Sequence, residues 1–188
     1  MDTRLSSEQW KEIESAETWG RGTQLPVLIN RKTGEVRNQS VAILRSICQD
    51  FGLTPMSSQG SFELDWYFET KAEFDIEPGV MDAIYKQNAT DESISLTVNA
   101  FSAFLERLDA RWADGRDHVT GRGISAADFN LVAFYTSVIT NRGLYNPTVS
   151  VKLRGRLEEL KNVKRVLENI RIPLDDTIRL LPEAGSWI

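Results

Sequence analysis

Residues 24–28 of the chain read Gln24-Leu25-Pro26-Val27-Leu28, and eleven positions further on, residues 39–44 read Gln39-Ser40-Val41-Ala42-Ile43-Leu44. The first stretch is apolar and has a proline near its start, which is typical of an edge strand, here Leu25–Asn30. Lys32-Thr33-Gly34 favours a turn, so we expect Glu35–Asn38 to return antiparallel. From Ser40 onward apolar side chains recur at helical spacing, and Gly52 is a natural helix end. This pattern predicts a hairpin followed by a helix.

The rest of the chain is predicted to be mostly helical. Ser125 and Asp128 form a capping box that marks one helix start, and Asn146-Pro147 marks another. Residues 113–123 are polar and glycine-rich and read as a connection. Further helices are expected over residues 6–18, 61–85 with a kink at Pro78-Gly79, 92–112 and 160–170. The predicted fold class is an α/β start, residues 1–53, followed by an all-α domain, residues 59–188.

Composition limits the function. Of 188 residues, 27 are acidic and 22 basic, which gives a net charge of −5 and disfavours a nucleic-acid surface. No apolar run reaches the roughly 20 residues that span a bilayer, so membrane insertion is not expected. One cysteine, Cys48, and a start without a basic-then-apolar leader indicate an intracellular protein, cytoplasmic by default, with a mitochondrial or ciliary complex as alternatives. His118 has no cysteine or second histidine nearby, so no metal site is predicted.

Several of these pieces resemble one known family. Residues 24–28, the hairpin turn and residues 39–44 are similar to the third strand, fourth strand and third helix of soluble glutathione transferases. The capped helix at 124–136 resembles the family's buried sixth helix, which carries a Ser/Thr-x-x-Asp box, and residues 145–164 are similar to the helices that follow. The Gln-Ser pair looks most like the sigma-type branch. The resemblance implies a truncated thioredoxin-like hairpin and helix, followed by a glutathione transferase-like helical bundle.

The resemblance also implies a ligand, glutathione, and residues that bind it. The peptide before Pro26 would be cis, so that the backbone of Leu25 pairs with the cysteinyl backbone of glutathione. Gln39 and Ser40 would hold its γ-glutamyl end, because a helix N-terminus favours a carboxylate. Trp10 would border the glycine end, although Glu14 stands where the family often has a basic residue. The alternative is that Gln39 and Ser40 only begin a helix.

The chain departs from the family at its start. There, the family has a strand, a helix and a strand, with a catalytic hydroxyl or thiol that holds the glutathione sulfur as thiolate. Here Asp2–Leu5 is at most a stub of that unit, every tyrosine lies in the helical part, and Cys48 lies inside a helix as a core residue. No catalytic residue is therefore assigned, and glutathione, if bound, is not expected to be used catalytically. The Leu25–Asn30 strand would present an open edge for other protein subunits.

Three functions remain open, in this order. The first is a non-catalytic glutathione transferase-like protein that acts as a structural or accessory subunit of a larger protein assembly. The second is a glutathione transferase, conjugating glutathione to electrophiles, whose first strand is absent or supplied elsewhere. The third is a non-enzymatic protein that binds another small ligand. A homodimer is open as well, and Trp66, Tyr67 and Phe68 are read as packing or interface residues rather than a substrate pocket.

Overall fold

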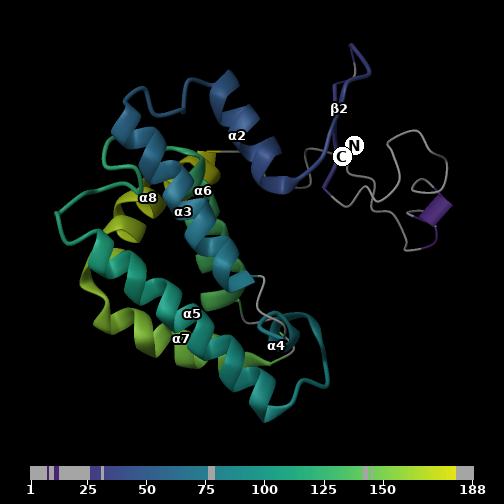
Figure 1. The fold of residues 1–188 in the computed structure, drawn as a ribbon, viewed down its shortest axis with the longest axis vertical. Helices are drawn as coiled ribbons and strands as arrows, with labels where there is room; N and C mark the ends of the chain where they lie inside the picture. The colour runs from purple at the N-terminus through teal and green to yellow at the C-terminus, as the bar shows by residue number, and fades with distance from the viewer. Residues whose placement is uncertain are drawn as a thin grey trace. The chain divides into compact units, whose positions relative to one another are not determined.

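The computed structural model describes Glu8, Lys11, Glu12 and residues 26–30, 32–75, 79–141, 144 and 146–180, with the backbone alone for 75 and 171–180. The chain divides into two compact units, Met1–Gly52 with Thr177–Ile188, and Leu53–Asp176. We describe each unit by itself (Figure 1). The predicted helix over 6–18 lies outside the described residues, except for Glu8, Lys11 and Glu12, which are helical.

The described part of the first unit is a hairpin and a helix, as predicted. Strands β1 (Leu28–Ile29) and β2 (Val36–Arg37) pair antiparallel, with Leu28 opposite Arg37 and Ile29 opposite Val36. The turn closes where Gly34, at φ 73°, donates its N–H to the Asn30 carbonyl at 2.8 Å. Helix α2 (Ser40–Asp50) follows and buries Ile43 and Cys48. It ends at Gly52, whose φ of 69° suits glycine.

The described part of the second unit is a helical bundle (Figure 1). The helices are α3 (Ser58–Asp75), α4 (Asp82–Tyr85), α5 (Asp91–Arg111), α6 (Ala126–Phe134), η1 (Tyr135–Ile139), α7 (Pro147–Glu159) and α8 (Lys161–Leu180). Four of the predicted starts are confirmed, those of α2, α5, α6 and α7, within one or two residues. The predicted single segment over 61–85 is wrong: α3 begins at Ser58 and ends at Asp75, and α4 is a separate short helix. A π-helical turn, η1, extends α6 and was not predicted.

Helix α5 is the centre of the second unit and packs against α3, α4 and α7. Its buried residues recur every three or four positions: Thr97, Ala100, Phe101, Phe104, Leu105 and Leu108. Aromatic rings from three helices meet around it, with the centroid of Phe134 4.9 Å from that of Phe101 and 5.8 Å from that of Phe104. Tyr67 completes this group at 6.1 Å from Phe104. Within the described residues no helix is long and apolar enough to cross a membrane.

Candidate functional site

The connection between β2 and α2 contains the most unusual backbone in the described residues. Gln39 has φ 69° and ψ 106°, and among those residues no other non-glycine has a positive φ. Such a conformation costs about 1–3 kcal/mol and persists where the surrounding structure imposes it. Gln39 and Ser40 are both exposed. The chain therefore presents a strained, solvent-facing turn where α2 begins.

The first turn of α2 has backbone N–H groups that the helix itself does not use. The Ile43 N–H donates to the Gln39 carbonyl at 2.9 Å, and the N–H groups of Ser40, Val41 and Ala42 precede that first bond. The Gln39 side chain makes no capping hydrogen bond to them. Free N–H groups and the helix dipole together favour a carboxylate at this position. The arrangement can hold an anionic group.

The structure brings together three of the five predicted binding residues. Pro26 is exposed and directly precedes β1 by two residues. Continued two residues beyond its last pair, the β1–β2 register sets Pro26 opposite Gln39, so that Pro26, Gln39 and Ser40 lie at the same end of the hairpin. Leu25 and Trp10 lie outside the described residues, and their ligand contacts and the cis peptide before Pro26 stay predictions.

An arginine that the sequence analysis did not single out links the hairpin to α2. Arg37 donates from Nε to Glu35 Oε1 at 2.9 Å and from Nη2 to Glu35 Oε2 at 3.2 Å. Its Nη1 donates to Ser46 Oγ, in the second turn of α2. Hydrogen bonding to Arg37, with its positive charge, lowers the pKa of Glu35 below the ordinary value.

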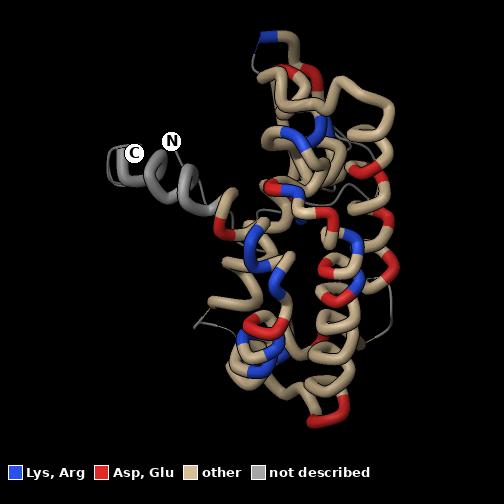
Figure 2. The backbone as a smooth tube through the Cα atoms, turned by 90° about the vertical axis from the view of Figure 1, so that its left-hand side faces the viewer, with Lys and Arg blue, Asp and Glu red and all other residues tan. Residues whose placement is uncertain are grey.

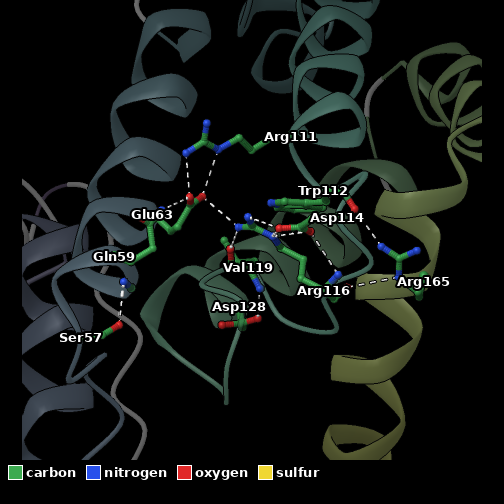
Figure 3. Close-up of polar contacts among 11 residues, drawn as sticks. Ser57, Gln59, Glu63, Arg111, Trp112, Asp114, Arg116, Val119, Asp128 and Arg165 are labelled. Atoms are coloured by element: carbon green, nitrogen blue, oxygen red, sulfur yellow. Dashed lines mark hydrogen bonds and ion pairs between the residues drawn. The ribbon is translucent and has the colours of Figure 1, made fainter.

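A second group of polar residues lies in the second unit and ties its helices together (Figure 3). We call it the Glu63 cluster: Gln59 and Glu63 of α3, Arg111 of α5, and Asp114 and Arg116 of the following loop. Glu63, with a side chain only 3% exposed, accepts from Arg111 Nη2 at 2.7 Å and from Arg116 Nη1 at 2.9 Å. Burial opposes ionisation of Glu63, but the hydrogen bonds and charges of both arginines outweigh it and lower the pKa of Glu63.

The capping box of α6 is joined to this cluster. Asp128 is fully buried; its Oδ1 accepts from the Val119 N–H at 2.8 Å, and its Oδ2 accepts from the Ser125 N–H at 2.8 Å and Oγ at 2.6 Å. Arg116 Nη1 also donates to the Val119 carbonyl at 3.0 Å. Burial raises the pKa of Asp128, although these hydrogen bonds and nearby His118 act in the opposite direction. The predicted helix start is confirmed, and the loop expected to be a plain connection joins α3, α5 and α6.

The Glu63 cluster is structural in character, because its acids and bases already neutralise one another. Acidic and basic residues are also interspersed along the outer faces of these helices (Figure 2). Only the position of Glu63, one residue before the buried Leu64, could have drawn notice to it from the sequence. Among the residues that the structure describes, no group of three or more His, Cys, Asp or Glu side chains could hold a metal ion.

The other residues weighed from the sequence pack in the interior. Cys48 is 3% exposed inside α2 and forms no disulfide, which confirms it as a core residue. Tyr67 is fully buried, and its hydroxyl donates to Asn130 Oδ1 at 3.1 Å. Phe68 is buried beside it, and Trp66 lies under the guanidinium of Arg111, 5.0 Å from the ring centroid. The interpretation of residues 66–68 as packing residues is confirmed.

Comparison with known proteins gives a fold but no close relative. No family model and no curated protein matches the chain. Three solved structures match over most of it. NaGST1 is 22% identical, with a TM-score of 0.70 over 97% of this chain and 84% of that one. The Pi-class glutathione S-transferase of Onchocerca volvulus is 21% identical, with a TM-score of 0.62 over 91% and 74%. A sphingomonad glutathione S-transferase in complex with glutathione is 20% identical, with a TM-score of 0.53 over 87% and 78%.

These likenesses agree with the architecture of both units. Each neighbour is a glutathione transferase by its printed name, and the described hairpin, α2 and helical bundle follow in the order that the sequence resemblance implied. At such identities the agreement concerns the fold, and the assignment to the sigma-type branch stays a prediction. The chain has a glutathione transferase-like fold, with a short two-stranded hairpin and a helix before a mostly helical bundle.

Proposed function

We propose that this protein is a non-catalytic glutathione transferase-like protein that binds the γ-glutamyl end of glutathione and serves as an accessory subunit of a larger assembly. The observation that carries the binding part is the strained Gln39 at the open N-terminus of α2. A helix needs no positive φ at its N-cap, since extended backbone is the usual choice there. Strain retained at an exposed turn is therefore better explained by a ligand than by helix initiation alone.

The chemistry of γ-glutamyl recognition fits this turn. The γ-glutamyl group carries an α-carboxylate and an α-amino group side by side. The free N–H groups of Ser40, Val41 and Ala42, with the Ser40 hydroxyl, supply donors for the carboxylate. The backbone or side-chain oxygens of Gln39 supply acceptors for the amino group. Charge-assisted hydrogen bonds of this kind are the stronger ones in binding sites.

The side chains of the described first unit support a non-catalytic role. Activation of the glutathione thiol needs a hydroxyl or thiol close to the sulfur. The described residues of this unit contain no tyrosine, Ser46 accepts from Arg37, and Cys48 is 3% exposed inside α2. Tyr67, in the second unit, is committed to Asn130 in a fully buried position. None of these groups is placed to activate a thiol at the start of α2.

The accessory role rests on the exposed side of the hairpin. Within the described residues β1 pairs with β2 alone, and its apolar residues Leu28 and Ile29 are 37% and 43% exposed. An apolar strand with an open edge is a natural site for a strand of another protein. A second copy of this chain is the alternative partner.

The experiment has two arms. Isothermal titration of the full chain with glutathione measures binding, and Ser40→Ala is expected to weaken it while Ser58→Ala, the first residue of the α3 helix, leaves it unchanged. A conjugation assay with a model electrophile is expected to give no turnover above the uncatalysed rate. Turnover that Ser40→Ala abolishes would instead favour the second candidate, a glutathione transferase, which is the activity in the printed names of the structural neighbours.

Co-purification tests the accessory role. The tagged chain, isolated from its source cells and analysed by mass spectrometry, is expected to bring down the same partner proteins reproducibly, and Ile29→Lys on β1 is expected to release them. A chain that purifies as a stable homodimer without other subunits would contradict it. Strong thermal stabilisation by a small molecule other than glutathione would favour the third candidate, a binding protein for another ligand.

A further inference from the structure

Arg37 occupies a particular place with respect to the strained turn. It is the last residue of β2, two residues before Gln39. Its guanidinium reaches back to both carboxylate oxygens of Glu35, at 2.9 and 3.2 Å, and forward to Ser46 Oγ of α2. The two segments that Arg37 connects are otherwise joined in sequence only by Asn38 and Gln39. The same side chain therefore brackets the turn from both sides.

The guanidinium suits this position better than another cation would. Its donors lie in a rigid planar fork, so that one side chain can engage a carboxylate in a bidentate manner and still present a separate N–H to a third acceptor. The hairpin and α2 are thereby held at one separation and angle. A two-residue connection across a fixed separation has few backbone solutions, and a residue with positive φ is one of them.

We propose that Arg37 is a positioning residue for the γ-glutamyl site, because its contacts with Glu35 and Ser46 hold Gln39 in the left-handed conformation. The effect on ligand affinity rests on the proposed function, whereas the effect on the backbone of Gln39 does not. Without these contacts, α2 is free to rotate against the hairpin, and Gln39 relaxes to a negative φ. The first turn of α2 then no longer lies where the ligand would meet Ser40.

The backbone effect is tested on the full chain by nuclear magnetic resonance. A positive φ brings the amide and α protons of a residue unusually close and gives an intense intraresidue Overhauser effect. That signal is expected for Gln39 in the unchanged protein and to fall to the level of its neighbours in Arg37→Met. Lys32→Met removes one positive charge from the same hairpin, where the described residues include no side-chain bond to Lys32, and is expected to retain it. An intense signal in Arg37→Met, with helix content unchanged by circular dichroism, would overturn the proposal.

The ligand effect is tested by titration with glutathione. Arg37→Met is expected to weaken binding about tenfold, the change that corresponds to the loss of one charge-assisted contact, and Lys32→Met by less than about twofold. Arg37→Lys keeps the charge but not the fork, so it is expected to bind no better than Arg37→Met. Equal affinity of Arg37→Met and the unchanged protein would overturn the positioning role. If the unchanged protein does not bind glutathione, the proposed function fails, and the resonance experiment alone decides the role of Arg37.

Discussion

Replacing Glu63 by glutamine tests the cluster that joins α3, α5 and the loop before α6. The carboxylate accepts four hydrogen bonds: from Gln59 Nε2 and Arg111 Nη2 on Oε1, and from Arg111 Nε and Arg116 Nη1 on Oε2. Glutamine has one acceptor oxygen in place of two, and its amide group points donors at donors. The two bonds to Oε2 are therefore lost, and two arginines remain without their counter-charge.

The size of the effect follows from burial. Each hydrogen bond to a charged group contributes about 1.5–3 kcal/mol when buried, but Arg111 is 33% exposed and recovers part of its loss from water. Arg116 is 10% exposed and recovers little. We expect Glu63→Gln to lower the free energy of unfolding by about 2–4 kcal/mol. Urea denaturation followed by tryptophan fluorescence at neutral pH measures it.

The matched control is Glu73→Gln, which removes the same charge from the same helix. Glu73 pairs with Arg107, but the two side chains are 60% and 47% exposed, so the expected loss is below about 1 kcal/mol. The pKa of Glu63 is lowered, so its stabilisation is present above the ordinary value of 4.5 and is lost as the pH falls through the lower, folded-state pKa. The difference between Glu63→Gln and the unchanged protein is thus expected to shrink in acid. Equal losses for the two variants, or a difference that does not depend on pH, would refute the reasoning.

Three further substitutions have defined outcomes in the same urea assay. Asp128→Ala leaves one hydroxyl and two N–H donors buried without an acceptor, so a loss of about 2–4 kcal/mol is expected; a loss like that of an exposed cap, below about 1 kcal/mol, would contradict it. Phe104→Ala removes a ring from the aromatic group around α5 and is expected to cost about 3–5 kcal/mol. Gly155→Ala in α7 meets open space and is expected to stabilise by about 0.5–1 kcal/mol. Gly60→Ala is expected to destabilise, because its Cβ would lie 2.7 Å from that of Pro55; the same sign for both glycines would show that backbone propensity outweighs contact.

Features that depend on a few neighbouring residues could be predicted from the sequence. The hairpin turn, the start of α2 at Ser40, the capping box of α6 and the proline at the start of α7 all agree with the structure. In each case the interactions join residues within one turn, and the identities of those residues are sufficient to identify them. The fold resemblance follows from the order of these local signals along the chain.

Features that join distant residues were decided by the tertiary structure. Glu63 lies 48 positions from Arg111 and 53 from Arg116, and no spacing rule connects them. The break between α3 and α4, expected only as a kink, leaves Val80 fully buried, with its carbonyl accepting a hydrogen bond from Thr97 of α5.

The candidate site divides in the same way. The sequence determined that Gln39 and Ser40 stand where a hairpin meets a helix, because turn and helix signals are local. The left-handed φ of Gln39 and the contacts of Arg37 with Glu35 and Ser46 were decided by the tertiary structure. The physical reason is that a backbone angle in a short connection follows from the separation and angle of the elements it joins, which packing sets and no single residue encodes.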